Sequence, residues 1–165
     1  MVRFLRNIGM NAAKRKYSQA FTTIEMIIGM TVLVLFFSIA IPVALKLADG
    51  IKSRTVIDDL IAIQIEIDKF KLDKGSYPDT LDDIYSGTQF DPWGTPYQYL
   101  RIAGGNKNVT GKQRKYKNLN INSTYDLYSI GPDGETVSPL TAAASFDDIV
   151  RGSNGRFLGD ANEFQ

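Results

Sequence analysis

The feature that most constrains this chain is an uncharged apolar run near its N-terminus, from Met26 to Leu45. As a helix, this run would be about 30 Å long, which matches the hydrocarbon core of a bilayer. Residues 1–20 carry five basic side chains and no acidic one. Because basic residues favour the cytoplasmic side, the sequence predicts a membrane span with residues 1–20 in the cytoplasm and the chain after Lys46 on the far side.

A single acidic residue, Glu25, lies next to the start of this run. An ionised carboxylate inside a bilayer costs on the order of a few kcal/mol unless a cation meets it, and the cost falls toward the membrane surface. The position of Glu25 therefore leaves two interpretations open. The carboxylate is either hydrated at the depth of the lipid headgroups, or it is paired with a cation.

The sequence around Glu25 resembles the class III signal of type IV pilins and pseudopilins. Its components are a short basic leader, the small residue Ala20, the segment Phe21–Glu25 and the apolar run. The resemblance implies that a prepilin peptidase cleaves between Ala20 and Phe21 and methylates the new amine of Phe21. It also implies that Glu25 pairs with the Phe21 amine of a neighbouring subunit, and that Pro42 bends the helix. Ala20 departs from the family, in which Gly usually precedes the cleavage site.

The composition excludes several classes of function. From Phe21 onward the chain carries 14 basic and 18 acidic residues, a formal charge of −4, so no nucleic-acid partner is expected. The absence of His excludes Ser-His and Cys-His catalysis and zinc sites built on histidine. The absence of Cys means that no disulfide closes the exported part. The adjacent Asp pairs at 58–59 and 82–83 are predicted to be helical surface, and the chain is predicted not to be an enzyme.

A helical pattern continues beyond Pro42. Apolar residues recur at steps of three and four, while charged residues fill most of the other faces. These apolar residues are Val56, Leu60, Ile63, Ile67 and Phe70. Ile57, Ile61 and Ile65 widen the stripe, which favours packing against a sheet over a two-stranded coiled coil. We therefore predict one long helix over residues 22–72, transmembrane in its first half and amphipathic in its second.

The chain after this helix predicts a small antiparallel sheet. Gly75 and Pro78 stop the helix, and Thr80–Asp83 has the spacing of a capping box that opens a short helix. Composition and alternation predict strands at 97–102, 116–121 and 125–130, with a short one at 156–158. Residues 106–117 are predicted to be a loop, and 135–165 a long irregular segment. The predicted fold class is α+β and pilin-like: a long N-terminal helix packed on a small antiparallel sheet, with a long C-terminal loop region.

Two motifs in the second half of the chain narrow the resemblance. Asp91–Tyr99 has the sequence DPWGTPYQY, and Tyr125–Gly134 has the sequence YDLYSIGPDG. They are similar to the two signatures of the major pseudopilins of type II secretion systems. Physically, the first is a rigid turn that places Trp93 and the following tyrosines on the long helix, and the second leads a strand into an Asp-Gly turn.

The second motif implies a calcium ion, because major pseudopilins typically bind one in the loop after this strand. Carried onto this chain, its ligands would include the backbone carbonyl of Ile130 and the carboxylate of Asp133. Asp147 and Asp148 are the later acidic residues closest in character to the remaining ligands. The segment 136–145 is longer and more apolar than the loop usual in the family. The alternative is that Asp133 forms only a turn and Asp147-Asp148 caps a helix.

The resemblance also implies a domain organisation and a location. Residues 1–20 would be a cleaved cytoplasmic leader, residues 21–45 the transmembrane and assembly helix, and residues 46–165 a periplasmic pilin-like domain. The chain would be a single-pass protein of the bacterial inner membrane before it enters a periplasmic pseudopilus.

The implied function is structural: a major subunit that polymerises through its N-terminal helix and drives the export of folded proteins. The implied partners are further copies of the chain, minor pseudopilins, the prepilin peptidase, membrane lipid and an inner-membrane assembly platform with a cytoplasmic ATPase. One alternative is the major type IV pilin of a surface fibre for adhesion, motility or DNA uptake. The other is a membrane-anchored binding or enzymatic domain whose leader stays uncut.

Overall fold

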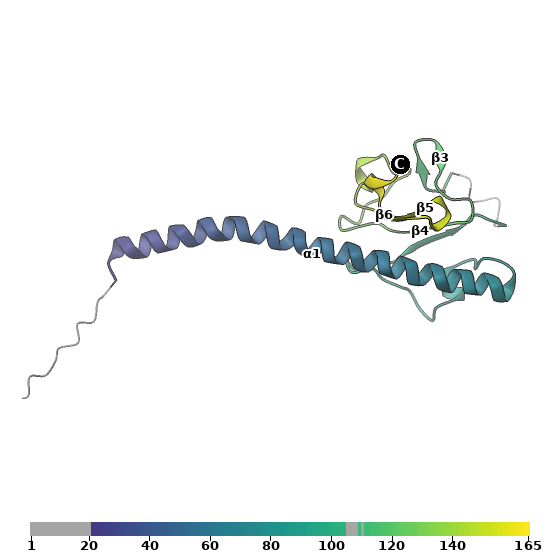
Figure 1. Ribbon diagram of the computed structural model, residues 1–165, viewed down its shortest axis with the longest axis horizontal. Helices are drawn as coiled ribbons and strands as arrows, with labels where there is room; N and C mark the ends of the chain where they lie inside the picture. The colour runs from purple at the N-terminus through teal and green to yellow at the C-terminus, as the bar shows by residue number, and fades with distance from the viewer. Residues whose placement is uncertain (1–20, 105–108, 110) are drawn as a thin grey trace, which may run out of the picture. The chain divides into compact units, whose positions relative to one another are not determined.

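The computed structural model describes residues 21–104, 109 and 111–165 (Figure 1). The predicted leader, residues 1–20 with Ala20, lies outside the described residues, as does part of the loop predicted at 106–117. The chain forms two compact units, one ending at Pro42 and the other beginning at Val43, and each is described by itself. One helix, α1 (Thr23–Lys74), belongs to both and confirms the predicted long helix.

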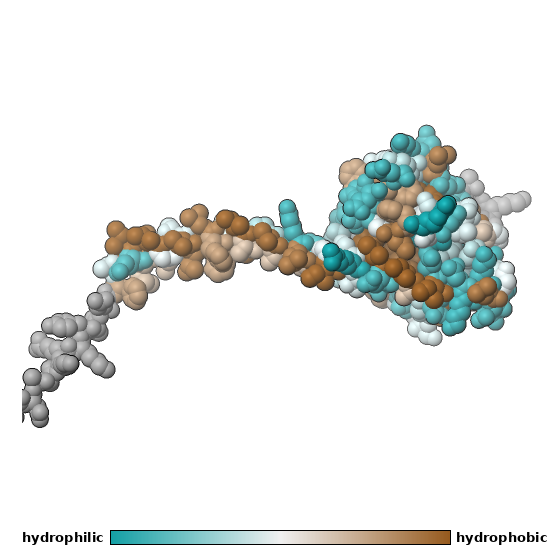
Figure 2. Space-filling model, in the orientation of Figure 1, coloured by the Kyte–Doolittle hydropathy of each residue, from teal (hydrophilic) through white to brown (hydrophobic). Residues whose placement is uncertain are grey.

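The first unit contains the apolar part of α1. The side chains from Phe21 to Ile39 are all exposed, and most of them are apolar (Figure 2). By length and composition, α1 can cross a membrane. Pro42 lies within the helix, and the bend predicted there stays a prediction. An exposed apolar surface of this extent is unfavourable in water, so it requires lipid or other apolar helices around it.

The second unit uses the remaining part of α1 as one wall of its core. The residues of α1 that are buried there are Val56, Leu60, Ile63 and Ile67. Ile57 packs beside them, but Ile61 and Ile65 are 41% and 58% exposed. The prediction that all three widen the buried stripe is therefore wrong for Ile61 and Ile65. Of these three isoleucines, the folded domain covers only Ile57, and the two on the following helical turns remain exposed to solvent.

A four-stranded antiparallel sheet packs on this part of α1 (Figure 1). Its strands, in spatial order, are β1 (Gln98–Arg101), β4 (Tyr125–Ser129), β5 (Ile149–Gly152) and β6 (Phe157–Asp160). Tyr99 lies opposite Leu127 in the register of β1 and β4, and Tyr128 lies opposite Val150 in that of β4 and β5. The predicted α+β fold class is confirmed.

Both faces of the sheet are covered. On the face toward α1, the buried residues are Tyr97, Tyr125, Leu127 and Ile149. A second cluster, to which β5 contributes Val150, consists of Ile121, Leu140, Val150, Ala161 and Phe164. The second cluster explains why β4 and β5 are buried along almost their whole length.

Several shorter elements complete the second unit. They are the hairpin β2 (Lys115–Tyr116) and β3 (Leu119–Asn120), and the 3-10 turns η1 (Leu81–Asp83), η3 (Ala143–Ser145), η4 (Ser153–Gly155) and η5 (Ala161–Glu163). The turn η1 confirms the predicted short helix, and the Asp83 carboxylate accepts the Thr80 N–H at 3.0 Å. The strands predicted at 97–102 and 125–130 are confirmed as β1 and β4.

Two other strand predictions differ from the structure. Residues 116–121 form the β2–β3 hairpin and not one strand, because Lys117 has a φ of 55°, a left-handed conformation that breaks an extended segment. The short strand predicted at 156–158 is confirmed as β6, but the rest of the segment 135–165, predicted to be irregular, also contains β5. All four residues of β5 are buried, so this strand lacks the alternation that marks a half-exposed one.

Candidate functional site

The residues predicted for processing and assembly lie at the start of α1. Phe21 precedes the helix and is 81% exposed, and Thr22 caps it. Glu25 Oε2 accepts hydrogen bonds from the Thr22 N–H at 2.9 Å and the Thr22 hydroxyl at 2.8 Å. The Glu25 N–H donates to the Thr22 hydroxyl oxygen at 3.3 Å. This reciprocal arrangement is a capping box, which the Thr-x-x-Glu spacing could have revealed in the sequence.

The first motif forms a turn that Asp91 closes. Asp91 is 5% exposed, and its Oδ1 accepts the N–H groups of Trp93 at 3.0 Å and Thr95 at 2.9 Å. The Asp91 N–H donates to the Thr95 carbonyl at 2.8 Å. Gly94 has a φ of 91°, a conformation that other residues rarely adopt. The structure therefore confirms the predicted turn and explains its Asp and Gly.

Two aromatic residues of this motif, Trp93 and Tyr97, contact α1, as predicted. Trp93 packs against the core beside α1, and Lys52 Nζ lies 5.9 Å from the centre of its ring. The Tyr97 hydroxyl donates to an Asp59 carboxylate oxygen at 2.7 Å. Burial and this hydrogen bond both raise the pKa of the Tyr97 hydroxyl. Tyr97 therefore stays protonated at neutral pH and acts as a permanent donor to the helix.

A contact that the sequence did not predict joins the two motifs. The hydroxyl of Ser129, a buried residue at the end of β4, donates to Asp91 Oδ2 at 2.6 Å. The Ser129 hydroxyl oxygen also accepts the Gly131 N–H at 3.2 Å. Asp91 and Ser129 are 38 positions apart, and no pattern in the sequence links them. One carboxylate oxygen of Asp91 therefore holds the turn, and the other holds the end of β4, just before the segment 131–148.

The structure brings two of the four predicted calcium ligands together. Ile130 is half-buried, and Asp133 is exposed. The Asp133 N–H donates to Asp147 Oδ2 at 3.3 Å, and Asp133 Oδ1 accepts the Glu135 N–H at 2.8 Å. The segment closes tightly here, because a side chain at Gly131 would collide with the backbone carbonyl of Asp147. Asp133 and Asp147 therefore meet where the two ends of the segment 131–148 approach each other.

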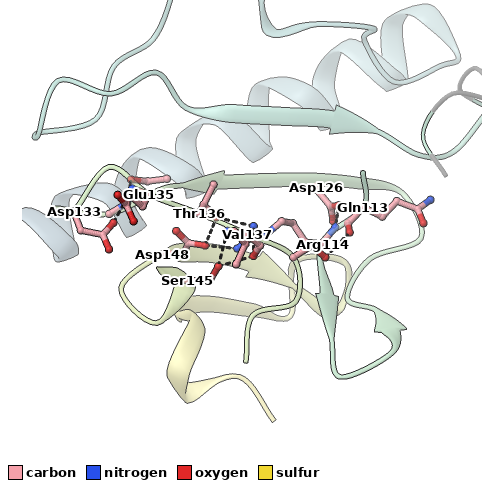
Figure 3. Close-up of polar contacts among 12 residues, drawn as sticks. Gln113, Arg114, Asp126, Asp133, Glu135, Thr136, Val137, Ser145 and Asp148 are labelled. Atoms are coloured by element: carbon pink, nitrogen blue, oxygen red, sulfur yellow. Dashed lines mark hydrogen bonds and ion pairs between the residues drawn. The ribbon is translucent and has the colours of Figure 1, made fainter. Parts of the chain in front are cut away.

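The fourth predicted ligand, Asp148, makes different contacts (Figure 3). Asp148 is fully buried, and its Oδ2 forms an ion pair with the Arg114 guanidinium. The same oxygen accepts the Thr136 hydroxyl at 2.7 Å. Burial raises the pKa of the Asp148 carboxyl, while the Thr136 hydrogen bond and the charge of Arg114 oppose that rise. The sequence gives no sign that Arg114 meets Asp148, because Arg114 lies in a basic segment predicted to be a loop.

As arranged here, the four predicted ligands do not fit one calcium ion together. Calcium takes six to eight oxygen ligands and is usually held by several carboxylates. Within residues 21–104, 109 and 111–165, no group of three or more His, Cys, Asp or Glu side chains could hold a metal ion. Asp133 and Asp147 lie close together, but Asp148 already has a cation as its partner. The predicted calcium ion stays a prediction, and of its four predicted ligands the hydrogen bond between Asp133 and Asp147 joins only two.

No protein-family model and no solved structure matches the chain. Among curated proteins, the chain is similar to type II secretion system core protein G from several bacteria. It is 27% identical over 143 residues to that of Pseudomonas aeruginosa, which covers 74% of this chain and 89% of that protein. It is 25% identical over 122 residues to that of Klebsiella pneumoniae, covering 70% of this chain and 86% of that protein.

The protein of the same name from Aeromonas hydrophila is 25% identical over 157 residues, covering 82% of this chain and 92% of that protein. These alignments extend over nearly the whole length of each relative. They confirm the resemblance that the two motifs predict. Over most of its length, this chain is similar to the major pseudopilins of type II secretion systems, core protein G.

Proposed function

We propose that the chain is the major structural subunit of a type II secretion pseudopilus. The observation that carries this proposal is the similarity to core protein G over most of both chains. The fold supports it, because a helix with a fully exposed apolar first half is joined to a small folded domain. The exposed apolar surface suits a subunit that is first held in lipid and then packed against copies of itself.

In this proposal, a prepilin peptidase removes residues 1–20 by cleaving between Ala20 and Phe21, and the amine of Phe21 is methylated. The exposed position of Phe21, just before the first residue of α1, supports its access to an enzyme and to a neighbouring subunit. The apolar run follows the cleavage site, so the mature chain keeps its membrane anchor.

Assembly is proposed to pair Glu25 of one subunit with the Phe21 amine of the next. The Thr22 N–H and the Thr22 hydroxyl both donate to Oε2 of the Glu25 carboxylate. In the part of the chain that the structure describes, no hydrogen bond ends on Oε1, so this oxygen can accept the amine while Thr22 still caps the helix. The pairing would neutralise two charges in an apolar bundle, where an unpaired charge is costly.

The proposed location is the inner membrane, with the leader cytoplasmic and the folded domain periplasmic. Assembly would use further copies of the chain, minor pseudopilins and an inner-membrane platform with a cytoplasmic ATPase. The growing homopolymer would act on folded proteins in the periplasm and drive their export. The negative formal charge of the chain after the leader supports a role without nucleic acid.

Deleting the gene from its host should abolish secretion of exoproteins, since a major subunit cannot be replaced by the minor ones. The measurement is the protein content of the culture medium, compared with the periplasmic fraction, where the exoproteins should accumulate. Complementation with the wild-type gene is the control. Normal secretion combined with loss of surface fibres or of motility would contradict the proposal and identify the chain as a surface pilin.

Mass spectrometry of the mature protein should find Phe21 as the first residue, with one methyl group on its amine. The expected mass excludes residues 1–20 and includes that methyl group. The control is the same protein from cells without a prepilin peptidase, which should retain the full leader. Recovery of the uncut chain from normal cells, with no filament formed, would contradict both processing and assembly and favour a permanently anchored domain.

A further inference from the structure

The side chain of Arg114 lies inside the folded domain, although the residues around it are polar and basic. Arg114 directly precedes β2 and is 3% exposed, whereas Lys112 two positions earlier is exposed. Its backbone N–H donates to Asp126 Oδ2 at 2.7 Å, and Asp126 is itself buried in β4. The guanidinium lies over the ring of Tyr128, 4.5 Å from its centre. The domain therefore fixes this arginine from both its backbone and its side chain.

The guanidinium binds both ends of the loop that the family motif assigns to calcium (Figure 3). Nη1 donates to the Thr136 hydroxyl oxygen at 2.7 Å and to the Val137 carbonyl at 3.0 Å. Nη2 forms the ion pair with Asp148 Oδ2. Thr136 and Val137 lie near the start of the loop, and Asp148 lies at its end, next to β5. One side chain thus connects the two halves of the segment 131–148.

Other contacts make this connection tight. The Thr136 hydroxyl donates to Asp148 Oδ2 at 2.7 Å, so the two loop ends also bind each other directly. The Ser145 hydroxyl bridges back to Val137, accepting its N–H at 3.0 Å and donating to its carbonyl at 2.5 Å. Within the described residues, the buried atoms Arg114 Nε and Asp148 Oδ1 have no hydrogen-bond partner. They are the two atoms that would complete a side-on bidentate arginine–carboxylate pair.

We propose that the Arg114 guanidinium is the structural cation of the segment 131–148 and takes the place of the divalent metal that the motif implies. A divalent ion bound by Asp148 would lie beside the fixed positive charge of Arg114, and the two cations would repel each other at low dielectric. With Arg114 alone, the buried pair is neutral. The domain then keeps this loop closed without calcium. This inference concerns the second unit only and does not rest on the proposed function.

The test uses the full mature chain in a mild detergent, with thermal unfolding followed by near-ultraviolet circular dichroism. The wild-type midpoint should change by less than about 2 °C between excess EGTA and millimolar calcium, since no calcium is needed. A wild-type midpoint that falls by more than about 5 °C in EGTA would show that calcium holds the domain, and would overturn the proposal. This comparison needs no variant and therefore no assumption about how a variant folds.

Variants test the role of the arginine itself. Arg114→Gln leaves the Asp148 carboxylate buried without its cation, so its midpoint should fall by about 10 °C or more. Arg114→Lys keeps the charge but loses the planar fork, and its midpoint should lie between those of Arg114→Gln and wild type. Lys112→Gln, an exposed position of the same basic segment, is the matched control and should match wild type. A wild-type midpoint for Arg114→Gln would overturn the proposal.

Discussion

Replacing Glu25 with alanine should abolish filament assembly and leave membrane insertion and leader cleavage intact. Without the carboxylate, each added subunit would bury the Phe21 amine among apolar helices with no counter-ion, at a cost on the order of a few kcal/mol per subunit. The measurement is the amount of protein in sheared or cross-linked filaments relative to the membrane fraction, which should fall to background. Mass spectrometry of the membrane fraction should still find Phe21 as the first residue.

Two further variants separate charge pairing from helix capping, because Glu25 also binds Thr22. Glu25→Gln keeps an acceptor for the Thr22 groups but removes the charge, so it should fail to assemble, as Glu25→Ala does. Thr22→Val removes the capping hydroxyl and keeps the carboxylate, so it should assemble. Filaments of normal abundance from Glu25→Ala would refute the pairing, and normal assembly of Glu25→Gln would reduce the role of Glu25 to capping.

Replacing Asp91 with alanine should destabilise the second unit by about 3–5 kcal/mol. The substitution removes the acceptor for two partly buried backbone N–H groups and for the buried Ser129 hydroxyl, and it leaves these donors without their partner. Trp93 is the only tryptophan of the chain, and its backbone N–H donates to Asp91. Its fluorescence during guanidinium unfolding of the full chain in a mild detergent therefore reports directly on this turn.

The matched control for Asp91→Ala is Asp82→Ala, at an exposed position of η1, with an expected change of about 0.5 kcal/mol or less. The stability of Asp91→Asn should lie between those of Asp91→Ala and wild type. Its side-chain carbonyl oxygen can still accept the two N–H groups, while its NH2 group faces Ser129. An Asp91→Ala variant as stable as Asp82→Ala would show that the contact between the two motifs contributes little to the fold.

The sequence was most informative where a local pattern decides the structure. The long helix follows from the uncharged run and the stripe after it, and β1 and β4 follow from alternation beside turn residues. The capping spacing at Thr80 also led to the correct element. Ile61 and Ile65 show the limit of such patterns, because a helix sequence shows which residues are apolar but not how far the sheet extends over them.

The elements that sequence reasoning missed depend on contacts between distant residues. In β5, Arg151 interrupts an apolar segment, yet it is 3% exposed because Gln64 of α1 and the Tyr125 carbonyl accept its N–H groups, at 2.8 and 3.2 Å. A charged residue with partners 87 and 26 positions away carries no local sign of burial. The strand was therefore mistaken for part of an irregular segment.

Arg114 shows the same limit for the candidate site. It follows Lys112 and Gln113 and precedes Lys115, and nothing in this segment distinguishes the one buried cation from its exposed or half-exposed neighbours. Its partner Asp148 is 34 residues further on. The family motif placed Asp133 and Asp147 at one predicted site, and the structure brings these two residues within hydrogen-bonding distance of each other. Only the three-dimensional contacts show which cation Asp148 meets.

A loop held by Arg114, Thr136 and Asp148, in a chain with no cysteine, closes without any oxidation step. Its formation therefore requires no oxygen, no thiol oxidoreductase and no reshuffling of wrongly paired bonds. The domain should fold equally well in strictly anaerobic cells and in the presence of reducing agents.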